Sequence, residues 1–334
     1  MRAKELRAVG MVCFLLYWAK EYVAMELVSS TVDRDRAFQS FLQKGLLEVP
    51  PALLEDGFLA RAKSSFEKQL EEFFRFLDDE AFAEKFHKAI GIGDPKDYLF
   101  RLYQMGSDDF VLTSLRFKGL DRNKPFIEIV QLTMDLPSFI SGHRAEVGEV
   151  YSLFAPATIR THSFTTSLPE SSEIDDFYVL AKLRDIRPPS QPTTIEKAID
   201  LSWYEDYVTS YNDLEINRNE VVACVETRES LQRSLDEGLL YCLRIDGKWA
   251  GVMGAVRLSQ WYFDGYYIFE KVIAKEYRGK GLSAKLESTF CQRLPNPDGT
   301  LVVYGQIHEV NEPSLRSAKS IGREVVGCNF FFPL

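Results

Sequence analysis

The residues best suited to chemistry lie from Val272 to Phe290, where an apolar strand leads through a glycine-bearing turn into a helix. The first N–H groups of a helix have no intrahelical partner and lie at the positive end of the helix dipole, so they can bind an anion. Gly279 and Gly281 let the backbone approach a phosphate closely, and Arg278 and Lys280 add positive charge. The segment therefore predicts a phosphate-binding turn.

Two familiar phosphate loops do not fit this turn. A P-loop requires Gly-x-x-x-x-Gly-Lys-Ser/Thr, but here Lys280 precedes its second glycine and no Ser or Thr follows that lysine. A dinucleotide-binding fingerprint requires three spaced glycines near the start of a βαβ unit, with an acidic residue about twenty residues later. An ordinary strand-turn-helix junction is the other alternative, and the sequence further downstream bears on it.

A second motif, Asn311-Glu-Pro-Ser314, follows a predicted fifth strand from Leu301 to His308. Proline in its first turn and Gly322 at its end are the expected punctuation of a helix. A last strand is predicted from Val325 to Phe332. The phosphate turn is thus followed, in order, by a strand, a capped helix and a final strand.

The pattern Arg278-x-x-Gly281-x-Ser283, followed by Asn-x-x-Ser at the right spacing, resembles the GNAT acyltransferase superfamily over about Thr193 to Leu334. The resemblance implies an α+β fold with a mixed, splayed central sheet flanked by helices. It implies that acetyl-CoA is the co-substrate and lies where the predicted fourth strand, from Tyr266 to Ala274, separates from the fifth, at the level of Ile273. The implied cofactor-binding residues are Ile273, Arg278, Gly279, Lys280, Gly281, Leu282, Ser283, Asn311 and Ser314.

The reaction implied by the resemblance is direct attack of an acceptor amine on the thioester. This reaction needs a base for the amine proton, amide donors for the developing oxyanion and a way to protonate the thiolate. Glu270 on the fourth strand is the first choice of base, although a strand carboxylate is equally often a salt-bridge partner. His308 at the end of the fifth strand is the second candidate. Tyr267 is the third, and we expect it on the opposite face of the strand from Glu270.

Three residues depart from the family pattern. Ser283 replaces a final glycine or alanine, Ala318 takes the place of a thiolate-protonating tyrosine, and Arg323 replaces a phenylalanine.

The sequence leaves three functions open. The leading one is an N-acetyltransferase acting on a small-molecule amine, a protein N-terminus or a lysine. The alternatives are a CoA-binding sensor or scaffold without catalysis, and an N-acyltransferase for a longer acyl-CoA, which a deep apolar pocket past Ile273 would favour. The hairpin from Trp261 to Gly265 is expected to overhang the acceptor site or to cap the core.

The predicted organisation has four parts: an apolar segment over 1–30, a helical and then α+β domain over 31–186, a proline-rich linker over 187–192 and the GNAT domain over 193–334. In the second part, Phe66, Leu70, Phe73, Phe74 and Leu77 share one helix face, which we assign to packing. The order of strands and helix there resembles a GNAT half without its phosphate turn. We therefore expect that the N-terminal domain is a degenerate GNAT-like half that forms one wall of the acceptor site.

Composition excludes some classes of partner. The chain has 334 residues, of which 46% are hydrophobic, enough for packed cores. A net charge of −9 argues against sequence-independent binding to nucleic acid and suits a cationic acceptor. The five cysteines are odd in number and lack a Cys-x-x-Cys pair, so we expect reduced core residues and no metal site.

The N-terminus bears on localisation. Basic residues precede the apolar run from Ala8 to Ala19, in the order that a secretory signal would have. The run is too short to span a bilayer, and no small-x-small cleavage site is evident. A buried first helix, or a natural start near Met25, are the alternatives. We expect a cytoplasmic protein without stable membrane insertion.

Overall fold

A single sheet of 12 strands runs through the computed structural model, which describes residues 25–164, 168–189, 193–212 and 225–334. Its strand order is β1-β2-β3-β4-β5-β12-β6-β11-β10-β9-β8-β7. The N-terminal half supplies β1 (Met25–Leu27), β2 (Arg101–Met105), β3 (Asp109–Phe117), β4 (Pro125–Leu132), β5 (Thr158–Ser163) and β6 (Glu173–Lys182). The C-terminal half supplies β7 (Ile195–Lys197), β8 (Leu240–Ile245), β9 (Lys248–Gln260), β10 (Phe263–Ile273), β11 (Val302–His308) and β12 (Glu324–Pro333).

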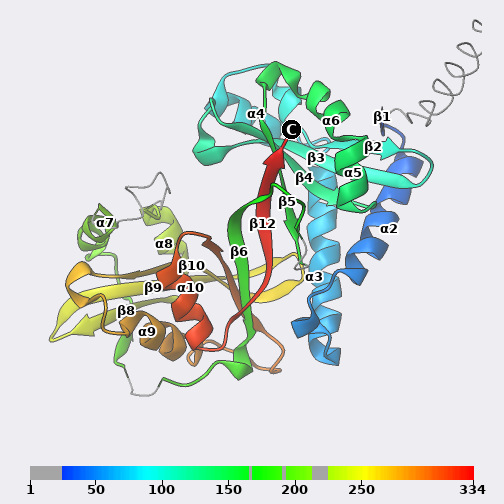
Figure 1. Cartoon of the computed structure of the whole chain (residues 1–334). Helices are drawn as coiled ribbons and strands as arrows, with labels where there is room; N and C mark the ends of the chain where they lie inside the picture. The colour runs from blue at the N-terminus through cyan, green and yellow to red at the C-terminus, as the bar shows by residue number, and fades with distance from the viewer. Residues whose placement is uncertain (1–24, 165–167, 190–192, 213–224) are drawn as a thin grey trace, which may run out of the picture.

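Helices connect these strands and pack on the faces of the sheet (Figure 1). The α-helices are α2 (Thr31–Leu47), α3 (Asp56–Arg75), α4 (Glu80–Ile90), α5 (Leu136–Gly142), α6 (Arg144–Val150), α7 (Tyr204–Asn212), α8 (Arg228–Asp236), α9 (Leu282–Cys291) and α10 (Glu312–Ser320). Short 3₁₀ turns are η1 (Pro51–Leu53), η2 (Pro95–Tyr98), η3 (Lys118–Leu120), η4 (Ser152–Phe154), η5 (Leu183–Asp185) and η7 (Lys275–Tyr277).

The sheet has an internal two-fold pattern. Its strand order reads the same from either edge when β1 to β6 are matched with β7 to β12. The pairings match as well, because each half has an antiparallel meander, β2-β3-β4 or β8-β9-β10, followed by a parallel pair, β4-β5 or β10-β11. This correspondence supports the expectation of two related halves.

The two halves exchange their last strands at the centre of the sheet. The N-terminal strand β6 lies between β11 and β12, and the C-terminal strand β12 lies between β5 and β6 (Figure 1). Neither half therefore completes its own backbone ladder. The predicted boundary at 187–192 falls between two units that share one sheet, and residues 190–192 lie outside the described part of the chain.

Both parallel pairs are short, so the sheet opens in two places. β4 and β5 pair only at Ile127–Ile159 and Glu128–Arg160. β10 and β11 pair only from Gly265 to Tyr267, although β10 continues to Ile273. The strands in each pair diverge beyond these contacts, and each divergence leaves backbone edges and a space between them.

Most predicted elements are present, and the exceptions have a physical cause. The apolar runs at 110–117, 126–134 and 177–183 predict strands, and they correspond to β3, β4 and β6. The helix face that contains Phe66 and Leu70 packs inward, and both residues are buried. The sequence around 145–154 predicts one helix, which divides into α6 and η4 in the structure. β2 and β5 were not expected; β5 has the polar sequence Thr-Ile-Arg-Thr-His-Ser and forms a strand because β12 pairs along it. The run from Ala8 to Ala19 lies outside the described residues.

Gly265 fixes the closed end of the opening between β10 and β11. A side-chain carbon at this position would overlap the backbone of Val302 on β11. We expect Gly265→Ala to lower the free energy of unfolding by about 3 kcal/mol, because backbone cannot move aside as a flexible side chain can. Urea denaturation measures this. Gly142→Ala is the control, since a carbon there meets nothing within 4 Å. Equal stability of the two variants would contradict the prediction.

Candidate active site

The opening between β10 and β11 holds a cavity of about 160 Å³. Pairing with β11 stops at Tyr267, so the edge of β10 from Ile268 to Ile273 has no strand partner on that side. The resemblance implied a separation at the level of Ile273; the separation begins five residues earlier, at Ile268, and includes Ile273. Predicted site residues lie together on the cavity wall, namely Glu270, His308, Asn311 and Ser314.

A β-bulge at Phe269 sets the direction of the side chains in this opening. Ile268 lies opposite Ala255 and Glu270 opposite Gly254, so Phe269 has no partner on β9. Side chains alternate along a regular strand, and one extra residue reverses the alternation. Tyr267 and Glu270 therefore lie on the same face of the sheet. The expectation of opposite faces was wrong, because nothing in the local sequence marks the bulge.

Glu270 is a buried carboxylate held by two tyrosines of α7. The hydroxyl of Tyr207 donates to it at 2.5 Å and that of Tyr211 at 2.8 Å. Burial raises the pKa of Glu270 to about 7, and the tyrosine hydrogen bonds oppose this rise. A carboxylate that titrates near neutral pH is suited to accept a proton from an amine.

The other two candidate bases lie nearby. His308 lines the same cavity, and its Nε2 is 3.9 Å from a carboxylate oxygen of Asp175. Tyr267 donates a hydrogen bond of 3.4 Å to the side chain of Gln306. Burial raises the pKa of Tyr267 to about 12, so its phenol stays protonated at neutral pH. Tyr267 can therefore donate a hydrogen bond, whereas Glu270 is the better base.

The phosphate turn has the expected backbone. Gly279 and Gly281 have φ of 76° and 69°, a region that favours glycine, and Gly281 is the N-cap of α9 without a side-chain cap. Leu282 and Ser283 form the first turn of α9. The N–H groups of this turn have no capping side chain, as an anion site requires.

The charged side chains of the turn contact backbone carbonyl groups. Arg278 donates to the carbonyl oxygen of Ile273 at 2.9 Å and to that of Ser210 at 2.8 Å. Lys280 donates to the carbonyl oxygen of Glu276 at 3.0 Å. Arg278 thus ties the turn to β10 and α7. Ile273 itself is buried and packs in the apolar cluster around α9.

The second motif also forms as expected. Asn311 is the N-cap of α10, and its side chain accepts a hydrogen bond from the N–H of Ser314 at 3.2 Å. Further along this helix, Ala318 is fully buried and packs with Val179 and Ile307. The place of the family tyrosine is thus filled by apolar packing.

A family model for the GNAT acetyltransferases matches residues 196–322, the segment that builds this opening and this turn. Residues 196–322 are a GNAT acetyltransferase domain. The family transfers acyl groups from acyl-CoA. Among solved structures, a GNAT-family acetyltransferase from Colwellia psychrerythraea is 9% identical with a TM-score of 0.51, and the match covers 93% of this chain and 99% of that one. That match shows that the fold similarity extends beyond the GNAT domain.

A second similar structure is a tandem GNAT protein from the clavulanic acid biosynthesis pathway, 13% identical with a TM-score of 0.48 over 93% of this chain and 98% of that one. No curated protein matches the sequence. No helix in the described ranges is long and apolar enough to cross a membrane. The same residues contain no group of three or more His, Cys, Asp or Glu side chains placed to hold a metal ion.

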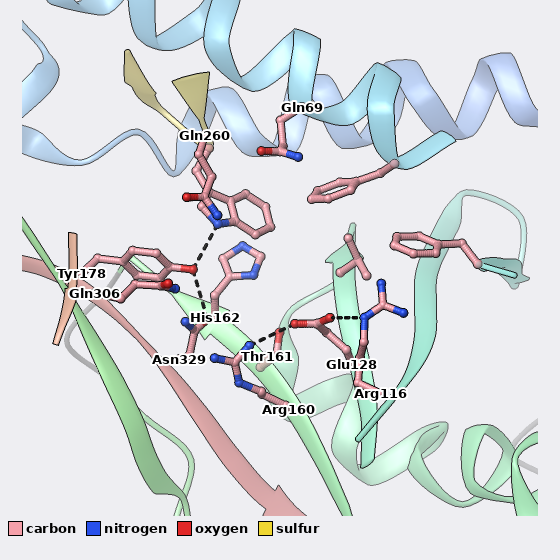
Figure 2. A pocket seen from close by; sticks show the side chains of 14 residues that line it. Gln69, Arg116, Glu128, Arg160, Thr161, His162, Tyr178, Gln260, Gln306 and Asn329 are labelled. Carbon is pink, nitrogen blue, oxygen red and sulfur yellow. Dashed lines mark hydrogen bonds and ion pairs between the residues drawn. The ribbon is translucent and has the colours of Figure 1, made fainter. Parts of the chain in front are cut away.

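A second cavity of about 300 Å³ lies between the GNAT domain and the N-terminal half (Figure 2). It begins where β4 and β5 diverge, and Gln306 of β11 lines both cavities. Its wall comes from both halves and consists of Gln69, Phe73, Phe100, Arg116, Glu128, Val130, Arg160, Thr161, His162, Tyr178, Gln260, Trp261, Gln306 and Asn329.

At the bottom of this second cavity, carboxylate side chains form ion pairs with an arginine. Arg160 contacts Glu128 at 3.1 Å, Asp175 at 2.9 Å and Asp176 at 3.0 Å (Figure 2 shows the Glu128 contact). Burial raises the pKa of Asp176 to about 6, against the neighbouring Arg160. These contacts hold the side chain of Arg160, which lines the cavity together with Glu128.

The side of this cavity next to the GNAT domain is lined by a histidine and two aromatic residues, His162, Trp261 and Tyr178. The rings of His162 and Trp261 lie 4.0 Å apart, and the indole N–H of Trp261 donates to the hydroxyl of Tyr178 at 3.0 Å. Burial lowers the pKa of His162 to about 3, so its ring is neutral. Trp261 belongs to the hairpin that was expected to overhang the acceptor site, and it lines this cavity.

Several of these residues were not singled out from the sequence. Tyr207 and Tyr211 are four residues apart on α7, and this spacing was the available sign that both hydroxyls could reach one partner. Arg160 and His162 lie on a strand that was not predicted. Gln306 carries no distinguishing pattern, because its position between two cavities depends on both halves.

Proposed function

We propose that this chain is an N-acetyltransferase that moves an acetyl group from acetyl-CoA to an amine by direct attack. The observation that carries the proposal is Glu270, a buried carboxylate with a pKa of about 7 at the cavity in the opening of the GNAT domain. Tyr207 and Tyr211 orient it. A base of this pKa can remove the proton that an attacking amine must lose at neutral pH.

The acceptor amine is expected in the cavity between the two halves. Gln306 separates this cavity from the opening of β10 and β11, and Tyr267 contacts Gln306 from the face that carries Glu270. The cavity is small and polar, and its lining combines amide side chains, aromatic rings and charged groups. These features support a small polar amine as acceptor, in preference to a protein lysine.

The proposed reaction uses groups on both strands of the opening. Acetyl-CoA would pair with the free edge of β10 from Ile268, with its pyrophosphate at the N-terminus of α9. The amine nitrogen attacks the thioester carbonyl, Glu270 takes the proton, and backbone N–H groups of the free edge stabilise the oxyanion. The carbon–sulfur bond then breaks and the thiolate leaves.

The size of the opening supports a short acyl chain. The cavity of about 160 Å³ is lined by charged and polar groups, including Glu270, Lys271 and Arg323. A long acyl chain would need apolar surroundings, because burying polar groups without partners is unfavourable. The longer acyl-CoA alternative is therefore less well supported than acetyl-CoA.

The test is acetyl-CoA turnover against a panel of amines, followed through release of the free CoA thiol. We expect thiol release with at least one small polar amine. Tight binding of acetyl-CoA without thiol release across a broad panel would instead favour a CoA-binding sensor. A preference for long-chain acyl-CoA over acetyl-CoA would contradict the proposed donor.

The pH dependence of turnover tests the role of Glu270 separately. Only the ionised carboxylate can accept a proton, so kcat/KM is expected to rise with pH and reach half its maximum near pH 7. Tyr211→Phe removes a hydrogen bond that lowers the pKa of Glu270, so the midpoint should move to higher pH. A midpoint that does not move in this variant would argue against Glu270 as the titrating group.

A further inference from the structure

Three charged residues form a buried cluster under the opening of the GNAT domain, on the face of β10 opposite Glu270. Lys271 and Arg323 both form ion pairs with Glu287 of α9, with N–O distances of 2.5 and 2.6 Å. Glu287 is fully buried and Arg323 is 3% exposed. Successive residues of a strand point to opposite faces, so Glu270 faces α7 while Lys271 faces α9.

The cluster carries one excess positive charge. Burial would raise the pKa of Glu287, but Lys271 and Arg323 outweigh it and lower that pKa, so the carboxylate is ionised. Among the described residues, Glu287 is the only carboxylate that forms an ion pair with either cation. A buried charge without a counter-charge is unfavourable. The cluster is therefore suited to receive an anion.

The guanidinium of Arg323 lies at the closed end of the opening. A side-chain carbon built on Gly305, the residue after the last β10–β11 pair, would lie 3.2 Å from Nη2 of Arg323 and 3.0 Å from the carbonyl oxygen of Ile268. Arg323 also lines the cavity of the opening. The excess charge thus lies where the two strands separate.

One donor of Arg323 is buried without a partner. Nη1 donates to Glu287 at 2.6 Å and Nη2 to the carbonyl oxygen of Val179 at 2.9 Å. Nε is buried and makes no hydrogen bond. Buried polar groups are nearly always hydrogen-bonded, and an exception calls for an explanation. A bound anion would supply both the missing acceptor and the missing negative charge.

The cluster is also connected to the phosphate turn. Lys271 donates to the hydroxyl of Ser317 at 3.2 Å, and that hydroxyl lies 3.0 Å from the hydroxyl of Ser283. Ser283 is in the first turn of α9. A polar chain thus runs from the predicted pyrophosphate site to the cations at the closed end, along the path expected for the cofactor arm.

We propose that Arg323, supported by Lys271, stabilises the thiolate that leaves during acyl transfer. The inference rests on the proposed function. As the amine nitrogen bonds to the carbonyl carbon, the carbon–sulfur bond breaks and sulfur keeps the electron pair. The amine proton goes to Glu270, which afterwards returns it to water, and the thiolate pairs with the guanidinium until release, when it takes a proton from water. This role substitutes for the acid that Ala318 cannot provide.

The test compares binding of CoA with binding of desulfo-CoA, which lacks the thiol, by calorimetry from neutral to alkaline pH. The unmodified protein should increasingly prefer CoA as pH rises, because an opposite charge a few ångströms away lowers the pKa of a bound thiol by about 1 to 3 units. In Arg323→Gln, the ratio of the affinity for CoA to the affinity for desulfo-CoA at alkaline pH should fall at least about tenfold, because a change of one unit in the thiol pKa corresponds to a tenfold change in affinity. Arg323→Lys should keep most of it.

Each glutamine substitution in the cluster leaves one positive and one negative charge there. Removing the charge of Arg323 leaves the Lys271–Glu287 ion pair intact. Lys271→Gln is a second variant of the same kind and leaves the Arg323–Glu287 pair. Arg316→Gln, which removes an exposed ion pair with Glu312 on α10, is the matched control and should change nothing. Melting temperatures check that each variant is folded.

The outcomes separate this inference from the proposed function. Unmodified protein that binds both ligands without a pH-dependent preference for CoA overturns the inference alone. An Arg323→Gln variant with an unchanged preference does the same. Absence of binding to either ligand overturns the proposed acyl-CoA site and the inference with it.

Discussion

Glu270→Gln is expected to lower kcat by about 100-fold to 10 000-fold while the affinity for acetyl-CoA stays unchanged. General base catalysis contributes a factor of this size, and glutamine keeps the shape of the side chain but cannot take up a proton. Stopped assays of CoA release give kcat, and calorimetry gives the affinity for acetyl-CoA. His308→Gln, in the same opening, is the comparison, and we expect it to have the smaller effect.

Stability measurements show whether a loss of turnover is a loss of fold. A carboxyl group normally titrates near 4.5, and burial raises the pKa of Glu270 in the folded protein to about 7. The folded state therefore binds more protons between these values, and stability decreases as pH rises through this window. The decrease amounts to at most about 3 kcal/mol.

Glutamine cannot ionise, so Glu270→Gln should be at least as stable as the unmodified protein at pH values above about 7. A variant that melts earlier there would point to a structural role. Unchanged turnover with at least one accepted amine would remove Glu270 from the base role and leave His308 as the next candidate.

Gly281→Asp is expected to lower the affinity for acetyl-CoA by at least about 100-fold while the domain stays folded, at a cost of about 1 to 2 kcal/mol because residue 281 is in the left-handed region. Aspartate is a good N-cap residue and tolerates the left-handed region better than most side chains, and a side-chain carbon at Gly281 meets nothing within 4 Å. Its carboxylate would occupy the N-terminus of α9 and repel a pyrophosphate there. Calorimetric titration with acetyl-CoA measures the loss.

In the N-terminal half, an aspartate already caps the helix that follows β4. Asp135 caps α5 after β4, and its carboxylate accepts a hydrogen bond of 2.9 Å from the N–H of Ser138. Gly281→Asn is the matched control, because asparagine has nearly the same shape and capping ability without the charge. Equal affinity of the Asp and Asn variants would contradict a phosphate site at this turn.

The sequence predicted the local backbone structure of the GNAT domain well. Glycines at 279 and 281 and the cap at Asn311 act through backbone geometry within a few residues, so their pattern predicts structure directly. The turn Asp246-Gly247 is of the same kind, with φ of 50° and 74°. The order of strands after the linker could be predicted because apolar runs alternate with these turns and helix caps.

The N-terminal half was harder to predict because its strands depend on partners far along the chain. β5 is polar in sequence and is stabilised by pairing with β12, which begins some 160 residues later. Pairing over such a distance leaves no local pattern. The bulge at Phe269 was missed for a different reason, because it depends on the register between β10 and the neighbouring strand β9.

The glycine turn at the start of α9 and the capped α10 could be predicted from the sequence alone, because phosphate binding by helix termini is a local property; the resemblance that these motifs carry implied an acyl-CoA donor. The sequence named Glu270, His308 and Tyr267 as candidate bases, and the tertiary structure distinguishes their surroundings. Tyr207 and Tyr211 meet Glu270, and Arg323 meets Glu287, because packing brings together groups from separate elements, and burial then changes their proton affinity and charge balance.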